Sequence, residues 1–434
     1  MAVLTSPALG GCMRVAITGM GAVSPIGLTA GELIEGLLSG ACGIRRAPWL
    51  PEGSASSQFY AGVSDRFDPS ARLDDKLIAG SDPFTWFSID GSDQALTDAG
   101  LLGGLDPLRT AIVHGTSMGG LFSLMQAQRA LEHGGPSAVS GKTMIKIWPN
   151  MACAQIAMRH DLHGPSLTVT TACASSLDAL GTAANMIRAG SADVAIVGGT
   201  EGGYPAGSHL EPGFLPATAA AEQGYGMRSG GDDPRRALLP FSADRAGIVP
   251  GEGSAWFVLE SEEHARGRGA RVWAWLRGYG SCADGYHPSS PEPSGRWERR
   301  AMELAQADAG VSPRDVDVLV AHATGTPKGD TAEIAALNAL FVEGAGHDGL
   351  VVTALKGHTG HTGASAGAMG VMTVIHAMHH GRLAFANGAA DRVDPEIQFD
   401  FVTEAPRAVD VGVAQVNAFG FGGQDASVVL SREV

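Results

Sequence analysis

Residues 166–199 of the sequence, SLTVTTACASSLDALGTAANMIRAGSADVAIVGG, decide the fold class. Apolar and β-branched runs at Ser166–Thr171 and Ala192–Gly198 predict two strands that are buried on both faces. The Ala- and Leu-rich stretch Ala174–Arg188 between them predicts a helix. A strand, a helix and a second strand within about 30 residues are typical of a parallel βαβ unit. The segment therefore predicts an α/β protein.

The same alternation of strands and helices occurs on both sides of this segment. Further strands are predicted at 14–21, 110–116, 316–321, 350–354, 411–417 and 426–430, and helices at 330–341 and from about 361 to 379. We expect two similar halves, residues 14–257 and 258–434, with a loop-rich insert at 203–250. Residues 1–13 have no basic start and only a short apolar stretch, so we expect a disordered leader and not a signal peptide.

The composition excludes several classes of protein. The chain has 434 residues and a formal net charge of −15, which disfavours binding to nucleic acid or to an anionic membrane. No run of about 18 apolar residues predicts a membrane span. The five cysteines contain no CxxC pair, so the sequence predicts neither a zinc site nor a disulfide framework, and it fits a reducing cytoplasm. No cofactor or metal is expected.

Cys173 lies at the predicted turn between a buried strand and a helix. The helix dipole and the free N–H groups at such a turn favour the thiolate, so we expect a lowered pKa. The same N–H groups could hold an oxyanion. The alternative is an inert, buried cysteine, which is the usual role of an isolated one.

Two histidines follow predicted strands in the C-terminal half. His322 comes directly after the strand at 316–321, and His361 precedes a predicted helix. Open α/β sheets place their sites at the carboxyl ends of strands. A single histidine there is more often structural, but two of them with a candidate thiolate at an equivalent turn form a catalytic constellation. His358 is a further candidate that the pattern does not exclude.

Several motifs in this order resemble those of the β-ketoacyl-acyl-carrier-protein synthases, and most closely the elongating type II enzymes of fatty-acid and polyketide synthesis. The motifs are TACASS (171–176), AHATGTPKGD (321–330), Lys356 with GH (360–361) and GASAG (363–367), NAFGFGG (417–423), Pro149–Met151 and PFSADRAGIVPGEG (240–253). The resemblance covers about residues 14–430. It implies a thiolase-like α/β fold with two similar βαβαβαββ halves in a five-layered α-β-α-β-α arrangement, and a dimer.

The resemblance also implies a role for individual residues. Cys173 would carry the acyl chain as a thioester, and His322 and His361 would bind the malonyl thioester, promote loss of CO₂ and stabilise the enolate. Both histidines should then be neutral, each with an N–H directed at the substrate. Lys356 would tune the electrostatic field around the histidines. The partner is acyl carrier protein, loaded with an acyl or a malonyl group.

Other matched positions concern the path of the substrate. The backbone N–H groups of Cys173 and Phe421 would hold the oxyanion, and Phe421 would also gate entry of the acyl chain. Thr324 and Thr326 would hydrogen-bond the pantetheine arm, and Met118 would limit the depth of the acyl tunnel. Taken alone, the Gly-Phe-Gly-Gly loop is more simply a turn and Met118 a core residue.

The sequence departs from the family pattern near the lysine. Gly370 stands where the family has the glutamate that pairs with the lysine, and Asp330 or Glu333 are the candidates to replace that carboxylate. Ala323 stands for the usual Gly, and Gln424-Asp425 for the usual Thr-Asn.

The surface expected to dock the carrier protein also departs from the pattern. Ala79-Gly80 and Ser137-Ala138 stand where fatty-acid enzymes often have Arg-Lys pairs. Either other basic residues or a partner subunit would then attract the acidic carrier protein. The candidate basic residues are Arg66, Arg72, Lys76, Lys142, Lys146, Arg228, Arg235 and Arg236.

We therefore predict a condensing enzyme that elongates an acyl chain, in a polyketide pathway in preference to housekeeping fatty-acid synthesis. A non-condensing subunit like the chain-length factors lacks the nucleophilic cysteine, whereas Cys173 is present. A thiolase needs a second catalytic cysteine in the C-terminal half, and none follows Cys282. A starter-type synthase would have Asn in place of His361. The dimer could be a homodimer or a heterodimer with a chain-length-factor-like subunit.

Overall fold

The computed structural model describes residues 14–46, 59–63, 66–203, 233–347, 349–388 and 392–433. The expected leader (1–13) and most of the expected insert lie outside the described residues. Within the described part of the chain, no helix is both long and apolar enough to cross a membrane.

Strands of the N-terminal half form one part of a continuous mixed sheet, in the order β5-β4-β6-β7-β1. These strands are β1 (Val15–Val23), β4 (Thr110–Gly115), β5 (Ser166–Val169), β6 (Val194–Glu201) and β7 (Gly253–Ser261). β4 pairs in parallel with β5 and β6, whereas β7 is antiparallel to both β6 and β1.

Strands of the C-terminal half continue the sheet in the order β8-β15-β14-β9-β10-β12. They are β8 (Ala274–Ala283), β9 (Val318–Val320), β10 (Val351–Thr353), β12 (Asp400–Phe401), β14 (Val413–Gly420) and β15 (Gln424–Ser431). β9 is parallel to β10 and β14, and β15 is antiparallel to β14 and β8, which repeats the pattern of the first half. The two parts meet where three residues of β1, Val15–Ile17, pair with β8.

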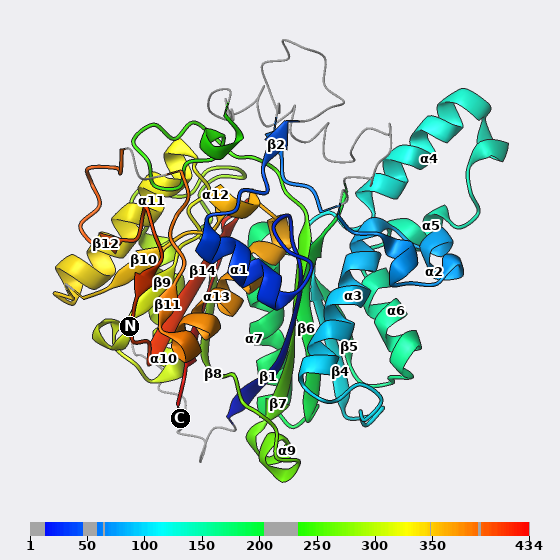
Figure 1. Ribbon diagram of the computed structural model, residues 1–434, viewed down its shortest axis with the longest axis horizontal. Helices are drawn as coiled ribbons and strands as arrows, with labels where there is room; N and C mark the ends of the chain where they lie inside the picture. Colours follow the sequence, from blue (N-terminus) through cyan, green and yellow to red (C-terminus); the bar gives the residue numbers. More distant parts are fainter. Residues whose placement is uncertain are drawn as a thin grey trace.

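The main helices complete a βαβαβαββ order in each half. They are α3 (Pro83–Asp98), α6 (Met151–His160) and α7 (Ser175–Arg188) in the first half, and α10 (Arg296–Ala309), α11 (Pro327–Leu337) and α13 (Ala366–His380) in the second. α7 and α13 contact each other between the two parts of the sheet, α3 covers β1, β6 and β7, and α10 covers β8 and β15 (Figure 1). The fold is therefore the thiolase-like, five-layered α/β arrangement that the resemblance implied.

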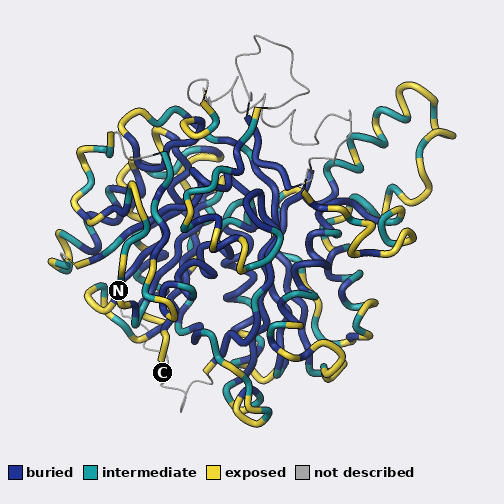
Figure 2. The backbone as a smooth tube through the Cα atoms, in the orientation of Figure 1, coloured by how far each residue is buried: buried dark blue, intermediate teal, exposed yellow. Residues whose placement is uncertain are grey.

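Shorter elements decorate this frame. They are α1 (Ala30–Ser39), α2 (Asp75–Gly80), α4 (Leu121–Gly134), α5 (Thr143–Ile147), α9 (Glu262–Gly267), α12 (Lys356–Thr359), β2 (Arg45–Arg46), β3 (Phe59–Tyr60), β11 (Arg382–Leu383) and β13 (Arg407–Ala408). α4 extends away from the body of the molecule, and neither α4 nor α5 has a buried residue (Figures 1 and 2).

The largest hydrophobic core lies between the two halves. Leu177 and Ile187 of α7 and Met372 and Ile375 of α13 belong to it, together with buried residues from both parts of the sheet. Figure 2 shows the buried backbone running through the centre of the molecule. Because this core is shared, a change on α7 also affects the packing of the C-terminal half.

Three predictions from the sequence need correction or comment. The strand at Ser166–Val169 is not buried on both faces: Ser166 and Leu167 are exposed, because β5 is the outermost strand of the sheet. The helix expected at 330–341 begins at Pro327 and continues as a π-helix, Asn338–Gly344. The boundary expected between the two halves, at residue 257, lies inside β7. It separates two repeated halves of the sequence that share one sheet, and this division stays a prediction.

Candidate active site

Cys173 lies on a sharp turn between β5 and α7. The turn is one 3₁₀ turn, Ala172–Ala174, and Ala172 has a left-handed φ of 50°. For a residue other than glycine this conformation costs roughly 1–2 kcal/mol. The Ser175 hydroxyl accepts the N–H of Thr171 (2.9 Å) and donates to the carbonyl of Ala172 (2.6 Å), which compensates part of that cost.

His361 contacts the cysteine from the C-terminal half. Its Nε2 lies 3.0 Å from Cys173 Sγ. The N–H of Gly363 donates to its Nδ1 (3.2 Å), so the proton of the neutral ring is on Nε2 and is directed toward the sulfur. The backbone of His361 is held by Val249 and Gly251 through hydrogen bonds of 2.7 and 2.8 Å. The ring is thus fixed as a donor at the reactive sulfur.

His322 completes the group from the end of β9. Lys356 Nζ lies 3.3 Å from His322 Nδ1 and also donates to the carbonyl of His322. A charged lysine can only donate, so the ring proton of His322 is on Nε2. The two imidazole rings lie 5.4 Å apart at 80°, and one ligand atom each from Cys173, His322 and His361 lie within 4.8 Å of one another. Two N–H donors and one sulfur therefore face a common space.

Burial sets the protonation of this group. Burial and the charge of Lys356 hold the pKa of both His322 and His361 well below the ordinary value, so both rings are neutral. Burial raises the pKa of Cys173 to about 11, although Lys356 and the backbone N–H groups of Phe421 and Cys173 lower it. The expected lowering of this pKa is therefore wrong, because burial outweighs the turn's N–H groups.

The lysine without its usual glutamate has another carboxylate nearby. Burial lowers the pKa of Lys356 to about 8, and Glu333 opposes that effect more strongly than Asp330 does. Glu333 accepts the backbone N–H groups of His322 and Ala323, each at 2.7 Å, and burial raises its pKa to about 7. A Cβ at Gly370 would lie 2.8 Å from Val416, so a side chain there needs the neighbouring residues to move. Of the two carboxylates left open as partners of Lys356, Glu333 therefore stabilises the charged lysine more than Asp330 does.

The sequence and structure of the chain match known proteins over nearly their whole length. The model of the β-ketoacyl synthase N-terminal domain matches residues 13–265, and that of the C-terminal domain matches residues 273–387. The chain belongs to the β-ketoacyl synthase family. It is an acyltransferase of that family.

Three relatives indicate which branches of the family are similar. The 3-oxoacyl-[acyl-carrier-protein] synthase 2 of Coxiella burnetii is 33% identical over 420 residues, which are 96% of this chain and 98% of the relative. The ishigamide ketosynthase/chain length factor structure has a TM-score of 0.87 and 28% identity, covering 97% of this chain and 99% of that one. A type II polyketide synthase acyl-carrier protein in complex with its ketosynthase bound to the hexaketide gives a TM-score of 0.86 and 25% identity, with coverages of 96% and 99%.

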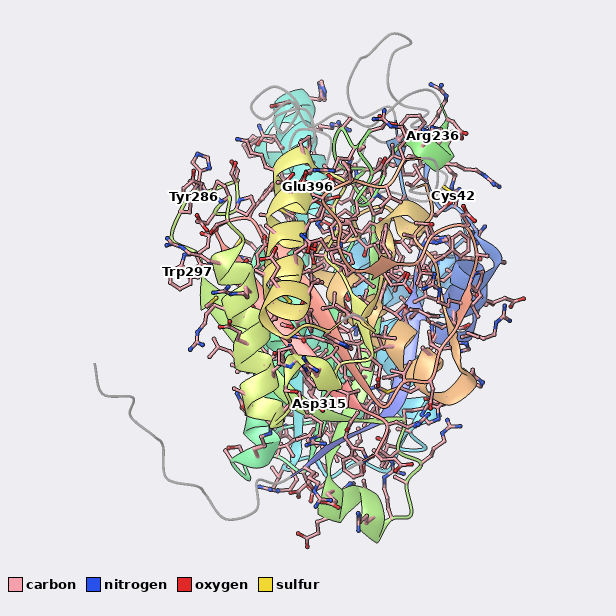
Figure 3. All side chains as sticks on the ribbon, turned by 90° about the vertical axis from the view of Figure 1, so that its left-hand side faces the viewer. Cys42, Arg236, Tyr286, Trp297, Asp315 and Glu396 are labelled. Carbon is pink, nitrogen blue, oxygen red and sulfur yellow. The ribbon has the colours of Figure 1, made fainter. Side chains whose placement is uncertain are left out.

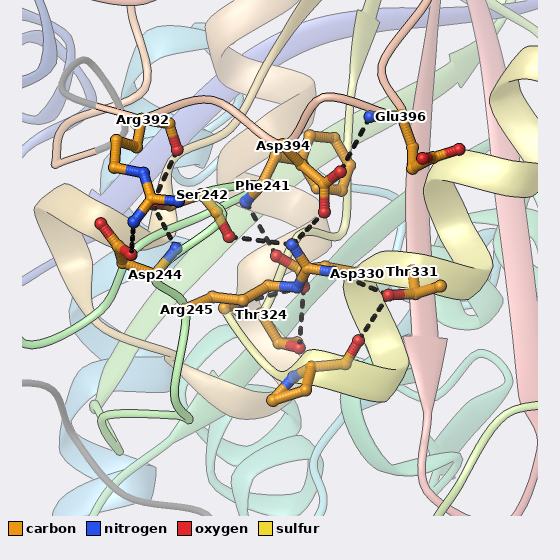
Figure 4. Close-up of polar contacts among 12 residues, drawn as sticks. Phe241, Ser242, Asp244, Arg245, Thr324, Asp330, Thr331, Arg392, Asp394 and Glu396 are labelled. Atoms are coloured by element: carbon orange, nitrogen blue, oxygen red, sulfur yellow. Dashed lines mark hydrogen bonds and ion pairs between the residues drawn. The ribbon is translucent and has the colours of Figure 1, made fainter.

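The two threonines expected to bind pantetheine lie in one hydrogen-bonded network of the synthase. Thr324 Oγ1 and Thr326 Oγ1 lie 2.9 Å apart, and Thr326 caps α11 by accepting the N–H of Gly329. Asp330 accepts the N–H groups of Gly325 (2.9 Å) and Phe241 (2.8 Å). Figure 4 shows Thr324 and Asp330 beside Arg245, which reaches Ser242, Thr331 and Asp394. Both threonines are buried, and their role toward substrate stays a prediction.

The Phe421 loop packs directly on the nucleophile turn. The Phe421 side chain is 49% exposed, while a Cβ at Gly420 would lie 2.7 Å from the carbonyl of Thr171. Asp425, which stands for the family's Asn, is buried, and burial raises its pKa to about 7. Ala323, which stands for the family's Gly, has a φ of 38°, where glycine would be unstrained. None of these departures removes one of the three candidate reactive groups.

Glu201, at the end of β6, was missed by the sequence reasoning. It accepts the Thr116 hydroxyl (2.8 Å) and the backbone N–H groups of Ser117, Met118 and Ala364. It therefore ties the predicted tunnel residue Met118 to the turn that follows His361. The sequence signal that could have indicated Glu201 was an acidic residue at the end of the buried, apolar strand predicted at 192–198.

Other candidate residues lie away from the site. Both ring nitrogens of His358 are hydrogen-bonded to backbone carbonyls, those of Ala41 and Phe385. Cys153 is buried, Cys42 is half-buried, and Cys282 donates to the carbonyl of Trp297 (3.2 Å). Figure 3 places Cys42 and Trp297 on opposite sides of the molecule.

A large cavity among the described residues lies away from this group. It has a volume of about 1110 Å³ and lies between α1, α3 and α13, with Ile34, Gln94, Trp273 and Ile375 in its walls. None of the predicted catalytic residues lines it. The chemistry of Cys173, His322 and His361, and not cavity size, identifies the candidate active site.

Proposed function

We propose that the synthase elongates an acyl chain by decarboxylative Claisen condensation with malonyl-acyl carrier protein. The observation that carries this is the placement of Cys173 Sγ 3.0 Å from the Nε2 of His361, with a second neutral histidine beside it. A thiol can bind an acyl group covalently, while two fixed N–H donors can stabilise an enolate oxygen.

Acyl transfer comes first. Cys173 Sγ attacks the carbonyl carbon of the acyl thioester, and the bond to the carrier's sulfur breaks. The thiol proton leaves with the carrier thiol. The backbone N–H groups of Cys173 and Phe421, which act on Sγ, would hold the oxyanion of this step.

Condensation follows at the histidines. The malonyl group loses CO₂, and the electron pair of the broken C–C bond forms an enolate whose oxygen accepts the Nε2–H groups of His322 and His361. The enolate carbon attacks the acyl carbonyl, the bond to Cys173 Sγ breaks, and the sulfur takes up a proton from solvent water. The product is a β-ketoacyl carrier protein two carbons longer. Lys356 holds His322 in the required tautomer.

We place the reaction in a polyketide pathway in preference to fatty-acid synthesis. The similarity to polyketide ketosynthases and the departures at Gly370, Ala79-Gly80 and Ser137-Ala138 support this. The alternative is a housekeeping β-ketoacyl-ACP synthase II, which the relative from Coxiella burnetii supports. A chain-length-factor-like role is disfavoured by Cys173. A cytoplasmic location belongs to the same proposal and rests on the cysteine pattern.

The partner subunit would pair along β5. Leu167 on that strand is 46% exposed, and the exposed large apolar residues Met144, Ile145 and Trp148 come from the neighbouring protruding region. An outer strand with free backbone groups and apolar neighbours is typical of an obligate interface, which buries well over about 2,000 Å². Either a second copy or a different subunit fits this surface.

The carrier protein would dock without the usual basic pairs. Ala79 and Ala138 are exposed where those pairs are expected. Of the other candidates, Arg72 forms an ion pair with Asp90, whereas Arg66, Lys76, Lys142 and Arg235 are exposed. Arg228 lies outside the described residues. These exposed basic residues, or a partner subunit, would supply the positive charge that attracts the acidic carrier protein.

Mass spectrometry of the products tests the function. The synthase is incubated with acyl- and malonyl-carrier proteins, alone and with a ketosynthase-like subunit that lacks the cysteine. We expect β-ketoacyl carrier protein extended by two or more units, formed only with the cysteine intact. A stable homodimer that is fully active alone would favour the housekeeping alternative. Absence of any condensation product in both conditions would contradict the proposal.

A further inference from the structure

The turn that carries Cys173 is held by a second set of hydrogen bonds, in addition to the two that the Ser175 hydroxyl makes. Thr171 Oγ1 donates to Asp178 Oδ2 at 2.5 Å. The other carboxylate oxygen, Asp178 Oδ1, accepts the hydroxyl of Tyr279 at 2.7 Å. Asp178 lies one turn inside α7 and is 5% exposed. One buried carboxylate thus connects the turn before Cys173 to a tyrosine of another element.

Tyr279 belongs to β8, in the C-terminal half. Its ring lies against α7 at Gly181, where a Cβ would be 2.2 Å from the ring carbon Cγ. A larger residue at position 181 would therefore displace the tyrosine from Asp178. Tyr279 is also in register with Val428 of β15, the strand that follows the Phe421 loop. The tyrosine joins the nucleophile turn to the part of the sheet that carries the gate.

A carboxylate is an expensive residue to bury for packing alone. Within the described residues, no lysine, arginine or histidine forms a hydrogen bond with Asp178, whose partners are the hydroxyl groups of Thr171, Tyr279 and Ser281. An unpaired buried charge is normally replaced by apolar residues unless its geometry is needed. Here the geometry restrains Thr171, the residue before the strained Ala172.

We propose that Asp178 and Tyr279 are positioning residues that hold Cys173 Sγ at His361 and the backbone N–H groups. This inference deepens the acyl-transfer step and rests on the proposed function. We call the contacts of Asp178 and Tyr279 the clamp. Without the clamp the strained turn relaxes, and the sulfur moves away from the N–H donors that stabilise its anion. The decarboxylation step uses the histidines alone and does not depend on the turn.

Three variants and one control test this proposal. Asp178→Ala removes the hydrogen bonds to Thr171, Tyr279 and Ser281, Tyr279→Phe removes one of them, and Asp178→Asn can keep them because each hydroxyl partner can donate or accept. Ser92→Ala is the matched control, because it removes a buried helix hydrogen bond in α3 (3.0 Å), far in sequence from the turn. Thermal unfolding of each variant reports general destabilisation.

The readouts separate the two partial reactions. We expect Asp178→Ala to slow acyl transfer to Cys173 by about 10- to 100-fold, the scale of misplacing a reacting group by about 1 Å. Tyr279→Phe should have a smaller effect, and Asp178→Asn should stay within about threefold of wild type. In a Cys173→Gln background, Asp178→Ala should leave malonyl decarboxylation unchanged. An Asp178→Ala enzyme with wild-type acyl transfer, or a parallel loss of both partial reactions, would overturn the proposal.

Alkylation of Cys173 by iodoacetamide distinguishes failure of the clamp from failure of the function. Alkylation needs no carrier protein, and we expect it to be slowed about tenfold in Asp178→Ala and unchanged in Ser92→Ala. If wild type forms no acyl enzyme but Asp178→Ala still slows alkylation, the proposed function fails and the clamp stands. An unchanged or faster alkylation rate in Asp178→Ala contradicts the clamp.

Discussion

The two halves of the synthase have the same order of elements but use the equivalent turn differently. In the first half β5 leads into α7 through one tight turn that carries Cys173. In the second half, β10 is followed by α12, His361 and a 3₁₀ turn before α13 begins. The longer connection makes room for Lys356 and His361. Our proposal thus assigns the covalent nucleophile to one repeat and the fixed hydrogen-bond donors to the other.

The outer strands of the two halves differ in the same way. β5 is at the end of the sheet and exposes Ser166 and Leu167, whereas β10 is covered by β12 and is largely buried. On the C-terminal side the sheet ends in the two-residue strand β12. On the N-terminal side it ends in β5, where we propose that a second subunit pairs. Similar topology therefore does not imply similar surroundings, and each difference can be tested by substitution.

The largest expected effect comes from removing the nucleophile of the first half. Cys173→Gln should lower condensation by about 10⁴-fold or more, because no covalent intermediate can form. Malonyl decarboxylation should persist, since both histidines remain. Rates of product formation and of CO₂ release measure the two steps. Condensation near the wild-type rate in this variant would remove Cys173 from the mechanism.

The reciprocal change concerns the donors of the second half. His322→Ala and His361→Ala should each lower decarboxylation by about 10²-fold or more, the scale for losing one oxyanion donor. Acylation of Cys173 should survive better than decarboxylation in both variants. Single-turnover acylation and CO₂ release give the comparison. Near wild-type condensation in both variants would contradict the two-histidine mechanism.

The next largest effect concerns the exposed strand. Leu167→Lys should weaken the dimer by about 30-fold, because it places a charge in an apolar contact worth about 2 kcal/mol. Leu102→Lys, at an exposed leucine outside β5, is the control. Light scattering across a concentration series measures the dimer. Equal behaviour of the two variants would show that β5 is not the interface.

The smallest predicted effect is a pH dependence above neutrality. The histidines, with pKa values well below the ordinary value, stay neutral from about pH 6.5 upward, so decarboxylation in Cys173→Gln should be flat up to about pH 7.5. Above the Lys356 pKa of about 8, the uncharged amine can accept the Nδ1–H of His322, which removes the Nε2–H donor. The rate should fall by up to about tenfold at pH 9.

The control for this profile is Lys356→Met, whose rate should be lower but should not fall further between pH 7.5 and 9. A decarboxylation rate of Cys173→Gln that rises between pH 6 and 7 with a midpoint near 6.5 would show that a histidine titrates there. That outcome would contradict the neutral, buried histidines.

Local patterns were sufficient for the elements around the nucleophile. The strands at β4 and β6 and the helix α7 lie within a few residues of their predicted bounds. Burial of β5 was predicted wrongly, because an apolar run does not say whether a strand lies at the centre or the edge of a sheet. The resemblance, and not periodicity, supplied the five-layered arrangement.

What the sequence could not supply depends on distances between remote segments. The raised pKa of Cys173 comes mainly from burial by residues far from the turn, so helix position alone gave the wrong sign. The choice of Glu333 over Asp330 needs the position of Lys356 in space. Glu201 and Asp178 act through contacts across the fold that sequence spacing does not reveal.

Peptide mass spectrometry of the acyl enzyme tests the central claim most directly. The synthase is incubated with an acyl-carrier protein thioester and no malonyl donor. It is then digested, and reduction at high pH is avoided. The account predicts one acyl group per chain, on the peptide that contains Cys173, and none in Cys173→Gln. Acylation of Cys42, Cys153 or Cys282 with Cys173 unmodified would contradict it.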